Sequence, residues 1–179
     1  MLQLSLNLNV NWQPTPQAIK PKDCWQTPSK ILDLINRSFT CGKIYTDPCT
    51  AENNPTKAEL FYTLKTNGLI SPWQHNAFVN PPYSAPHLWI EEINLRIASG
   101  EINEAISLLP TSCLGSDRAG RPAKLAKALC LWRGRIYFIN PQTGKAQKNT
   151  SFTSAFLYWG EFPRHFCRMF DPYGITASW

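Results

Sequence analysis

The stretch Ala77–Ser84 constrains the fold more than any other part of the sequence. It reads Ala-Phe-Val-Asn-Pro-Pro-Tyr-Ser, an apolar run followed by two consecutive prolines. Each proline fixes φ at about −65° and lacks an N–H group, so the pair cannot continue a sheet ladder. The apolar run therefore predicts the end of a buried strand, and Asn80–Tyr83 is predicted to be a stiff polar loop that follows it.

The chemistry of this loop follows from its residues. The prolines hold the Asn80 amide and the Pro81 carbonyl in place with few local donors, so both groups are acceptors available to a ligand. Tyr83 adds a flat aromatic ring. This combination suits a planar ligand with an amino group at its edge, such as a nucleobase. A polar strand-to-helix turn with a packed tyrosine is the alternative interpretation.

The residues after the loop predict a βαβ unit. Apolar residues recur at helical spacing at Trp89, Ile90, Ile93 and Ile97, until Ser99-Gly100 breaks the pattern. The run Ala105–Leu109, stopped by Pro110, is typical of a buried parallel strand. With 179 residues, the chain is long enough for about one domain. We predict an α/β domain over residues 23–179, with a mostly parallel sheet, preceded by an irregular N-terminal arm over residues 1–22.

Patterns before the loop predict a helix and a second strand. Thr27 is placed to cap a helix whose first residue is Pro28. Lys43–Thr46 is a predicted strand that leads into the polar loop Asp47–Pro55. Because open α/β sheets bind ligands at the carboxyl ends of their strands, Asp47 is a candidate site residue. A simple Asp-Pro turn is the alternative.

The C-terminal third predicts an antiparallel hairpin at one edge of the sheet. Ala123–Leu131 is a plausible helix, Arg133–Ile139 a strand, and Ser151–Trp159 a final strand. The long turn-rich segment between the two strands suits an antiparallel pair.

Charge and cysteine usage narrow the function. The net charge of +6 suits a polyanionic partner such as DNA or RNA. Basic residues cluster after the strand ending at Leu109, on the side where DNA phosphates could approach, and are predicted to bind DNA; a solvated surface is the alternative. They are Arg118, Arg121, Lys124, Lys127, Arg133 and Arg135. The six cysteines form no CxxC pair and the three histidines make no close pair, so no metal site is expected. No apolar run is long enough for a membrane span, and we expect a cytoplasmic protein.

A series of short motifs, in this order, resembles the phage-type DNA N6-adenine methyltransferase family. The motifs are Trp25-Gln26-Thr27-Pro28, Asp47-Pro48-Cys49, Asn67-Gly68-Leu69, Asn80-Pro81-Pro82-Tyr83-Ser84, Leu108-Leu109-Pro110 and Gly134-Arg135-Ile136-Tyr137-Phe138. The resemblance runs from about Trp25 to about Trp159, which is nearly the whole chain.

The resemblance implies a single Rossmann-like methyltransferase domain that uses S-adenosylmethionine. It places Thr27 and Pro28 beside the methionine end of the cofactor, Asp47, Pro48 and Cys49 in the first cofactor loop, and Asn67 near the cofactor adenine. Asn80, Pro81, Pro82 and Tyr83 would be the catalytic loop. The implied substrate is a DNA adenine, flipped from the duplex or single-stranded, in a bacterial host cell.

One loop and one single position depart from the family pattern. The loop Asp47–Pro55 contains no glycine, whereas such cofactor loops are commonly glycine-rich, and position 67 is asparagine where the family usually has aspartate. Two alternatives therefore stand beside the DNA methyltransferase: an enzyme that methylates RNA or a protein glutamine, and a DNA-binding relative without catalytic activity.

Overall fold

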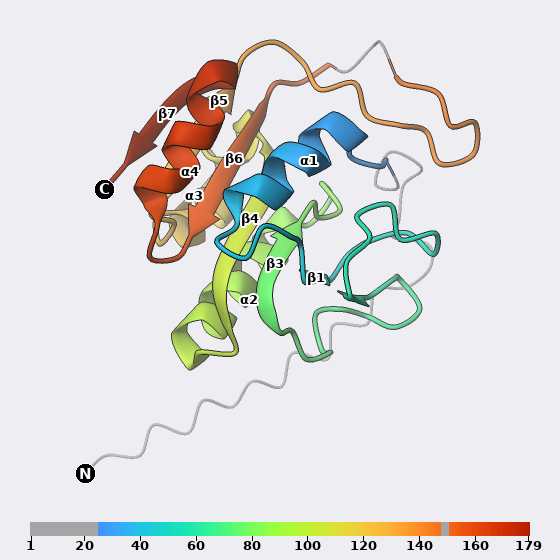
Figure 1. Cartoon of the computed structure of the whole chain (residues 1–179), viewed down its shortest axis with the longest axis horizontal. Coiled ribbons are helices and arrows are strands. Elements are labelled where there is room, and N and C mark those ends of the chain that lie inside the picture. The colour runs from blue at the N-terminus through green and yellow to red at the C-terminus, as the bar shows by residue number, and fades with distance from the viewer. Residues whose placement is uncertain (1–24, 148–150) are drawn as a thin grey trace.

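The computed structural model describes residues 25–147 and 151–179, which build helices on both faces of one mixed sheet (Figure 1). The described helices are α1 (Ser29–Ser38), α2 (Pro86–Ser99), α3 (Asp117–Ala123) and α4 (Pro163–Phe170), with short 3₁₀ helices η3 (Thr111–Cys113) and η4 (Asp171–Tyr173). The strands are β1 (Thr46–Asp47), β2 (Leu60–Phe61), β3 (His75–Val79), β4 (Ile102–Pro110), β5 (Ala128–Trp132), β6 (Ser154–Trp159) and β7 (Gly174–Ser178). The predicted arm over residues 1–22 lies outside the described residues, so the division of the chain into arm and domain stays a prediction.

The described strands form a seven-stranded sheet in the order β2-β1-β3-β4-β6-β5-β7. The first four of these strands pair in parallel. The remaining three pairings, from β4 to β7, are antiparallel. The predicted α/β class is confirmed, with a parallel core and an antiparallel section at one side. That section is wider than a hairpin, because β7 pairs with β5 and forms the outer edge.

Two apolar cores lie on opposite faces of the sheet. On one face, α1 and α4 cover side chains such as Phe78, Ile106 and Phe156. On the other face, α2 and α3 cover Val79 and Leu109. Figure 1 shows α1 and α4 in front of the sheet and α2 behind it. Side chains that alternate along each strand enter both layers, which is why β3 is buried from Asn76 to Val79 and β4 from Glu104 to Pro110.

The predicted βαβ unit is confirmed. β3 ends at Val79, and α2 begins at Pro86, where a missing N–H costs nothing. α2 stops at Gly100, whose φ of 76° lies in the left-handed region that favours glycine. β4 then runs parallel to β3 and ends at Pro110. The Asn80–Tyr83 loop therefore lies at the carboxyl end of a buried parallel strand.

The predicted helix over Ala123–Leu131 is wrong. α3 ends at Ala123, directly after Pro122, and β5 begins at Ala128. Ala128 and Cys130 are fully buried, whereas the alternating residues between and after them are more exposed. Burial that alternates from one residue to the next identifies a strand. The alternation is not visible in the sequence, because all of β5 is apolar.

The predicted strand Arg133–Ile139 is also wrong. Ile136 and Phe138 are buried and Tyr137 is half exposed, so the alternation in the sequence is real. The segment gains this burial by packing on the face that carries α1, outside the sheet. Ile139 forms isolated bridges with Gln26 and Ala146. We call residues 133–147 the crossing segment, because it passes the start of α1 (Figure 1).

Three further predictions need correction at the ends of elements. The helix α1 begins at Ser29 with Pro28 in the capping position and no side-chain cap, so Thr27 is not the N-cap. The strand predicted over Lys43–Thr46 is shorter, because β1 begins three residues later, at Thr46, and ends one residue later, at Asp47. The strand near residues 151–159 is not the last, because α4 and β7 follow it.

Candidate active site

A cavity of about 310 Å³ opens at the carboxyl ends of β1 and β3. Its walls come from the residues before α1, the loop after β1, the turn before β3, the loop after β3 and the start of α2. The lining residues are Trp25, Gln26, Thr27, Asp47, Pro48, Cys49, Thr50, Ala51, Glu52, Pro55, Thr56, Thr63, Leu64, Asn67, Gly68, Phe78, Asn80, Pro82, Ser84, Ala85, Trp89 and Pro141. This is the position at which open parallel sheets bind ligands.

The Asn80 side chain is held from two sides. Its Nδ2 donates to the Thr27 Oγ1 at 3.3 Å and to the Trp25 backbone oxygen at 3.5 Å. Its Oδ1 accepts a hydrogen bond of 3.0 Å from the Tyr83 hydroxyl. The amide is therefore anchored at the edge of the cavity by partners that precede α1 and by its own loop.

Tyr83 is partly buried and packs against the core on the face that carries α1. Its ring meets the rings of Phe138 and Phe152 edge-on, at centroid distances of 6.4 and 5.4 Å. Burial raises the pKa of the Tyr83 phenol well above its ordinary value, and the nearby Cys113 and Cys49 raise it further. The phenol therefore stays protonated and donates to Asn80.

Asp47 supplies a buried carboxyl group to the cavity. It is only 4% exposed. Its Oδ2 accepts from the Thr56 hydroxyl at 2.8 Å, and its Oδ1 from the Cys49 N–H at 3.2 Å. Burial raises the pKa of Asp47 from 3.8 to about 6, and hydrogen bonds from Thr56, the Cys49 N–H and Thr50 limit the rise. The carboxyl group is thus poised to ionise fully when a cation binds beside it.

Cys49 connects the loop after β1 with the loop after β3. Burial raises the pKa of the Cys49 thiol well above its ordinary value, and the Asp47 carboxylate raises it further. A hydrogen bond from the Asn80 backbone N–H opposes this rise. The thiol is therefore protonated at neutral pH and lies against the backbone of Asn80.

The turn before β3 approaches the Asp47 loop closely at Gly68. A Cβ added at Gly68 would lie 1.9 Å from the Pro48 carbonyl oxygen, which only glycine avoids. Asn67 has a φ of 49°, a conformation that asparagine tolerates better than most residues. The Gly68 carbonyl accepts from the Trp73 indole N–H at 2.7 Å. Gly68 therefore allows the facing turn to pack directly on the backbone of the Asp47 loop.

The structure brings most of the predicted site residues together. Thr27, Asp47, Pro48, Cys49, Asn67, Asn80 and Pro82 line the cavity. Pro28, Pro81 and Tyr83 adjoin these residues in the chain but do not line the cavity. Their predicted roles stay predictions.

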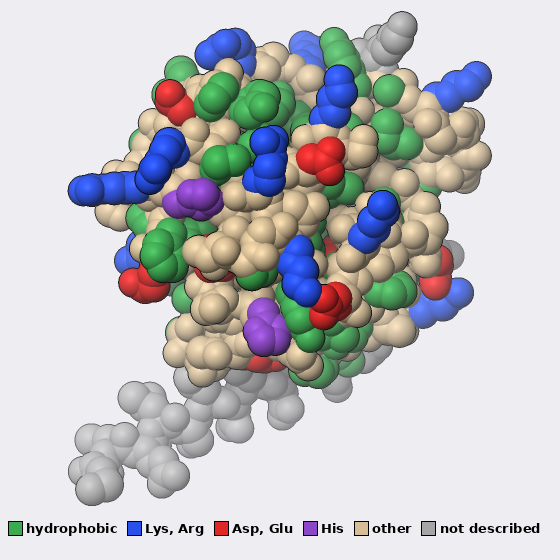
Figure 2. Space-filling view, in the orientation of Figure 1, with side chains coloured by type: hydrophobic (Ala, Val, Ile, Leu, Met, Phe, Trp, Pro, Cys, Tyr) green, Lys and Arg blue, Asp and Glu red, His purple; other side chains and the backbone are tan. Residues whose placement is uncertain are grey.

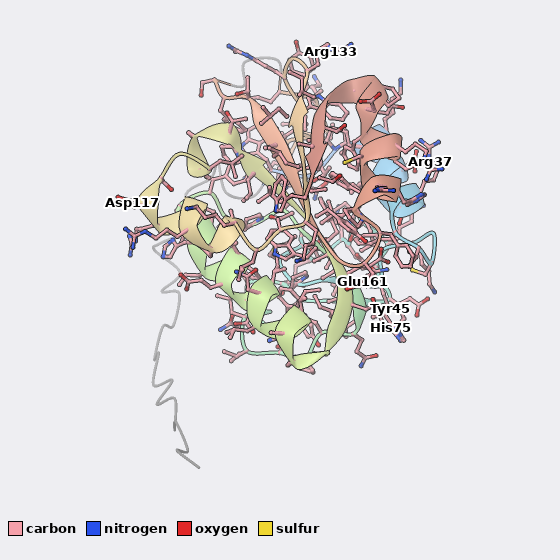
Figure 3. All side chains as sticks on the ribbon, turned by 90° about the vertical axis from the view of Figure 1, so that its left-hand side faces the viewer. Arg37, Tyr45, His75, Asp117, Arg133 and Glu161 are labelled. Carbon is pink, nitrogen blue, oxygen red and sulfur yellow. The ribbon has the colours of Figure 1, made fainter. Side chains whose placement is uncertain are left out.

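The basic residues predicted to bind DNA lie in two places, away from the cavity walls. Arg118 and Arg121 are on α3 and Lys124 is at its end, whereas Arg133 and Arg135 begin the crossing segment. Figure 3 shows Asp117, at the start of α3, and Arg133 at different corners of the molecule. Figure 2 shows Lys and Arg side chains scattered over the face that carries α1 and α4. A single compact basic patch formed by all five residues is therefore not present.

Sequence reasoning missed several lining residues. Glu52 adds a second carboxyl group five residues after Asp47, and its acidic side chain in the same polar loop was a usable signal. Trp25 and Gln26 belong to the motif that contains Thr27, yet their contact with the cavity depends on where α1 packs. Pro141, from the crossing segment, had no local signal at all.

Within residues 25–147 and 151–179, no three His, Cys, Asp or Glu side chains are grouped as a metal site. Among the helices in those ranges, none has the length and apolar character needed to cross a bilayer.

A parallel α/β core, a ligand-sized cavity at its strand ends and an Asn-Pro-Pro-Tyr loop beside that cavity define a Rossmann-like methyltransferase domain. The family model for DNA N-6-adenine-methyltransferase (Dam) matches residues 15–175, so the chain belongs to this family of enzymes. No curated protein and no solved structure matched the chain.

Proposed function

We propose that this enzyme transfers a methyl group from S-adenosylmethionine to the exocyclic N6 amino group of adenine in DNA. The observation that carries the proposal is the Asn80 amide, whose oxygen accepts a hydrogen bond from Tyr83 while its NH2 group is bound on the opposite side. An acceptor held in this way beside a cavity suits the polarisation of an amino group.

The cavity has the chemistry that S-adenosylmethionine requires. Carboxyl groups from Asp47 and Glu52 suit a cationic ligand, and Pro48, Pro55 and Leu64 offer apolar walls to an adenine ring. The cavity volume of about 310 Å³ is in the range of small-molecule sites. When bound, the cofactor would supply an electrophilic methyl group on a sulfonium that leaves as a neutral thioether.

We assign the cofactor contacts to residues that surround the cavity. Thr27 and Pro28 would lie at the methionine end of the cofactor. Asp47, Pro48 and Cys49 would form the first cofactor loop, and Asn67 would lie near the cofactor adenine. The raised pKa of Asp47 supports its role, because an adjacent cation stabilises the ionised carboxyl group.

The catalytic loop would act by positioning and polarising the substrate. The adenine amino nitrogen is a poor nucleophile, because its lone pair is delocalised into the ring. If the Asn80 Oδ1 and the Pro81 carbonyl each accept one of its N–H groups, the nitrogen is drawn towards tetrahedral geometry and its lone pair becomes available. Pro82 keeps the loop stiff.

Stacking of Tyr83 on the adenine stays a prediction. In the structure its ring contacts Phe138 and Phe152, so stacking would require Tyr83 to leave that contact. Within a duplex the target base must also leave the helix, at a cost of a few kcal/mol.

DNA phosphates would be bound by two separate groups of basic residues. One group is Arg118, Arg121 and Lys124 at α3, and the other is Arg133 and Arg135 on the crossing segment. The first group follows β4, and the second belongs to the segment whose Pro141 lines the cavity. Their separation suits an extended duplex better than a small anion.

The experiment that tests this proposal locates the transferred label. The protein is incubated with S-adenosylmethionine labelled in its methyl group and with unmethylated DNA, RNA or protein, and the modified atom is identified by mass spectrometry. The proposal expects N6-methyladenine in DNA. Label in RNA or in a glutamine side chain, or no transfer at all, would contradict it.

Asn80→Ala is the matching variant. We expect it to lower the transfer rate by at least about 10²-fold, as for loss of one polarising hydrogen bond, while DNA binding changes little. More than about a tenth of the wild-type rate would remove Asn80 from this role.

A further inference from the structure

The orientation of the Asn80 side-chain amide decides whether it can serve the proposed chemistry. A carboxamide has an accepting oxygen on one side and a donating NH2 group on the other. Rotation by 180° exchanges the two without changing the shape of the side chain. Only the oxygen can accept an N–H from a substrate amino group, so a reversed Asn80 would oppose its own function.

The Trp25 carbonyl specifies which orientation is stable. The hydroxyl groups of Thr27 and Tyr83 can each donate or accept, so neither alone chooses between the two orientations. The Trp25 backbone oxygen can only accept, and it lies 3.5 Å from Asn80 Nδ2. A reversed amide would place two oxygens against each other. The NH2 group therefore points towards the residues before α1, and the Tyr83 hydroxyl must donate to Oδ1.

Thr27 holds the amide in the orientation that the Trp25 carbonyl selects, and it does so at the shorter distance. Its Oγ1 lies 3.3 Å from Asn80 Nδ2, and the residue is only 6% exposed. It is also rigid, because α1 begins two residues later and buries Ile31, Leu34 and Ile35 in the core. The packing of α1 therefore fixes the position of the Thr27 hydroxyl that Asn80 binds.

We propose that Thr27 is a positioning residue for methyl transfer, which accepts a hydrogen bond from Asn80 and holds the amide in the orientation set by the Trp25 carbonyl, with its oxygen available to the substrate amino group. This inference rests on the proposed function. A carbonyl oxygen accepts two hydrogen bonds, so the bond from Tyr83 leaves one lone pair of Oδ1 for the substrate. The role is separate from any contact that Thr27 makes with the cofactor.

The first test compares two substitutions of Thr27. Thr27→Val keeps the shape and removes the hydroxyl, whereas Thr27→Ser keeps the hydroxyl and removes the methyl group. In single-turnover assays at saturating cofactor, we expect Thr27→Val to slow transfer by about 10- to 100-fold. Thr27→Ser should stay within about threefold of the wild-type rate. Equal losses in the two variants, or no loss in Thr27→Val, would overturn the proposal.

The second test removes the group that Thr27 binds. Asn80→Asp has no NH2 group, so the hydrogen bond that Asn80 donates to Thr27 is absent. Combined with Asn80→Asp, Thr27→Val should slow transfer by less than about threefold relative to Asn80→Asp alone. If Thr27 acted through the cofactor or through packing, its full effect would persist in this background, and that result would reject the positioning role.

A third measurement separates this inference from the proposed function. Failure of the proposed function would be seen in the unmodified protein as absence of label in DNA adenine, or as an active Asn80→Ala variant. Failure of the inference alone would leave both of those results as expected, with Thr27→Val as active as Thr27→Ser. Cofactor affinity, measured by calorimetry, should differ by less than about threefold between the two Thr27 variants.

Discussion

The two loops that face each other across the cavity are held in place in different ways. The loop after β1 is stabilised by its own residues: Asp47 accepts hydrogen bonds from Thr56 and from the Cys49 N–H, and Asn54 binds the backbone of Ala58. All of these partners lie within one short stretch of chain.

The loop after β3 is stabilised from a distance. Asn80 is bound by Trp25 and Thr27, and Tyr83 is packed by Phe138 and Phe152. The loop after β1 is therefore held mainly by nearby residues, with one hydrogen bond of 2.9 Å from Gln26 to Asn53. The loop after β3 takes its geometry from residues 25–27 and from Phe138 and Phe152. Substitutions in the two loops should accordingly fail in different ways.

The largest effect on stability is expected at Gly68, where the turn before β3 meets the loop after β1. In Gly68→Ala the new Cβ would collide with the Pro48 carbonyl, at 1.9 Å, so the backbone must move. The free energy of unfolding, measured by urea denaturation, should fall by about 3 kcal/mol. Gly115→Ala is the matched control, because its nearest neighbour would be 4.0 Å away, at the Ser112 carbonyl. Equal stability of the two variants would argue against the close approach.

Asp47 should couple cofactor binding to pH. Its pKa of about 6 lies above the ordinary 3.8, so its contribution to stability is complete below about pH 4 and is lost as pH rises through about 6. A bound cation favours the ionised form of Asp47, so affinity for the cofactor should rise with pH. Affinity for S-adenosylmethionine should rise about tenfold from about pH 5 to about pH 7.5.

Asp47→Asn provides the control for this trend. Titration calorimetry should find weaker binding with a flat profile over the same range, and no proton release that depends on residue 47. A variant that keeps the wild-type pH profile would show that the cation does not bind beside this carboxyl group.

A smaller effect is expected from the hydroxyl of Tyr83. Tyr83→Phe keeps the ring between Phe138 and Phe152 but removes the donor to Asn80, so transfer should slow by about fivefold. Tyr137→Phe serves as the control, because that ring is half exposed. Single-turnover rates distinguish the two, and identical rates would mean that the bond to Asn80 has no role in transfer.

The smallest effects concern the two basic groups. Reversing Arg118 and Arg121 to Glu should flatten the salt dependence of DNA binding by about one unit of log–log slope per residue. Arg133→Glu should do the same for the crossing segment. Arg37→Glu is the control, because Figure 3 shows Arg37 on the opposite side of the molecule from Asp117. An unchanged slope for either group would exclude it from the DNA-binding surface.

The contrast between the loops also explains what the sequence could predict. β3, α2 and β4 were predictable because their apolar runs and the prolines at residues 81, 82 and 110 are local signals. The motif at Asp47 was recognisable for the same reason. β5 was mistaken for a helix because every residue in it is apolar or small, which hides the period of two.

What could not be predicted depends on contacts between distant residues. The strand pattern at Ile136 and Phe138 arises from packing against Tyr83 and α1, and no local feature distinguishes it from a true strand. Similarly, the motif around Thr27 suggested a helix cap, whereas its hydroxyl binds Asn80 instead. The residues of the loops after β1 and β3 were therefore predictable, whereas Pro141 and the contacts that orient the site residues were not.

The crossing segment offers a consequence for engineering. Its base is fixed by the bridges from Ile139 to Gln26 and Ala146, while residues 142–145 at its tip are exposed. Exposed tips of this kind accept insertions and exchanges with little effect on the remaining structure. Libraries that vary the length and sequence of this tip can therefore be screened for altered DNA site preference while every residue that holds Asn80 is left unchanged.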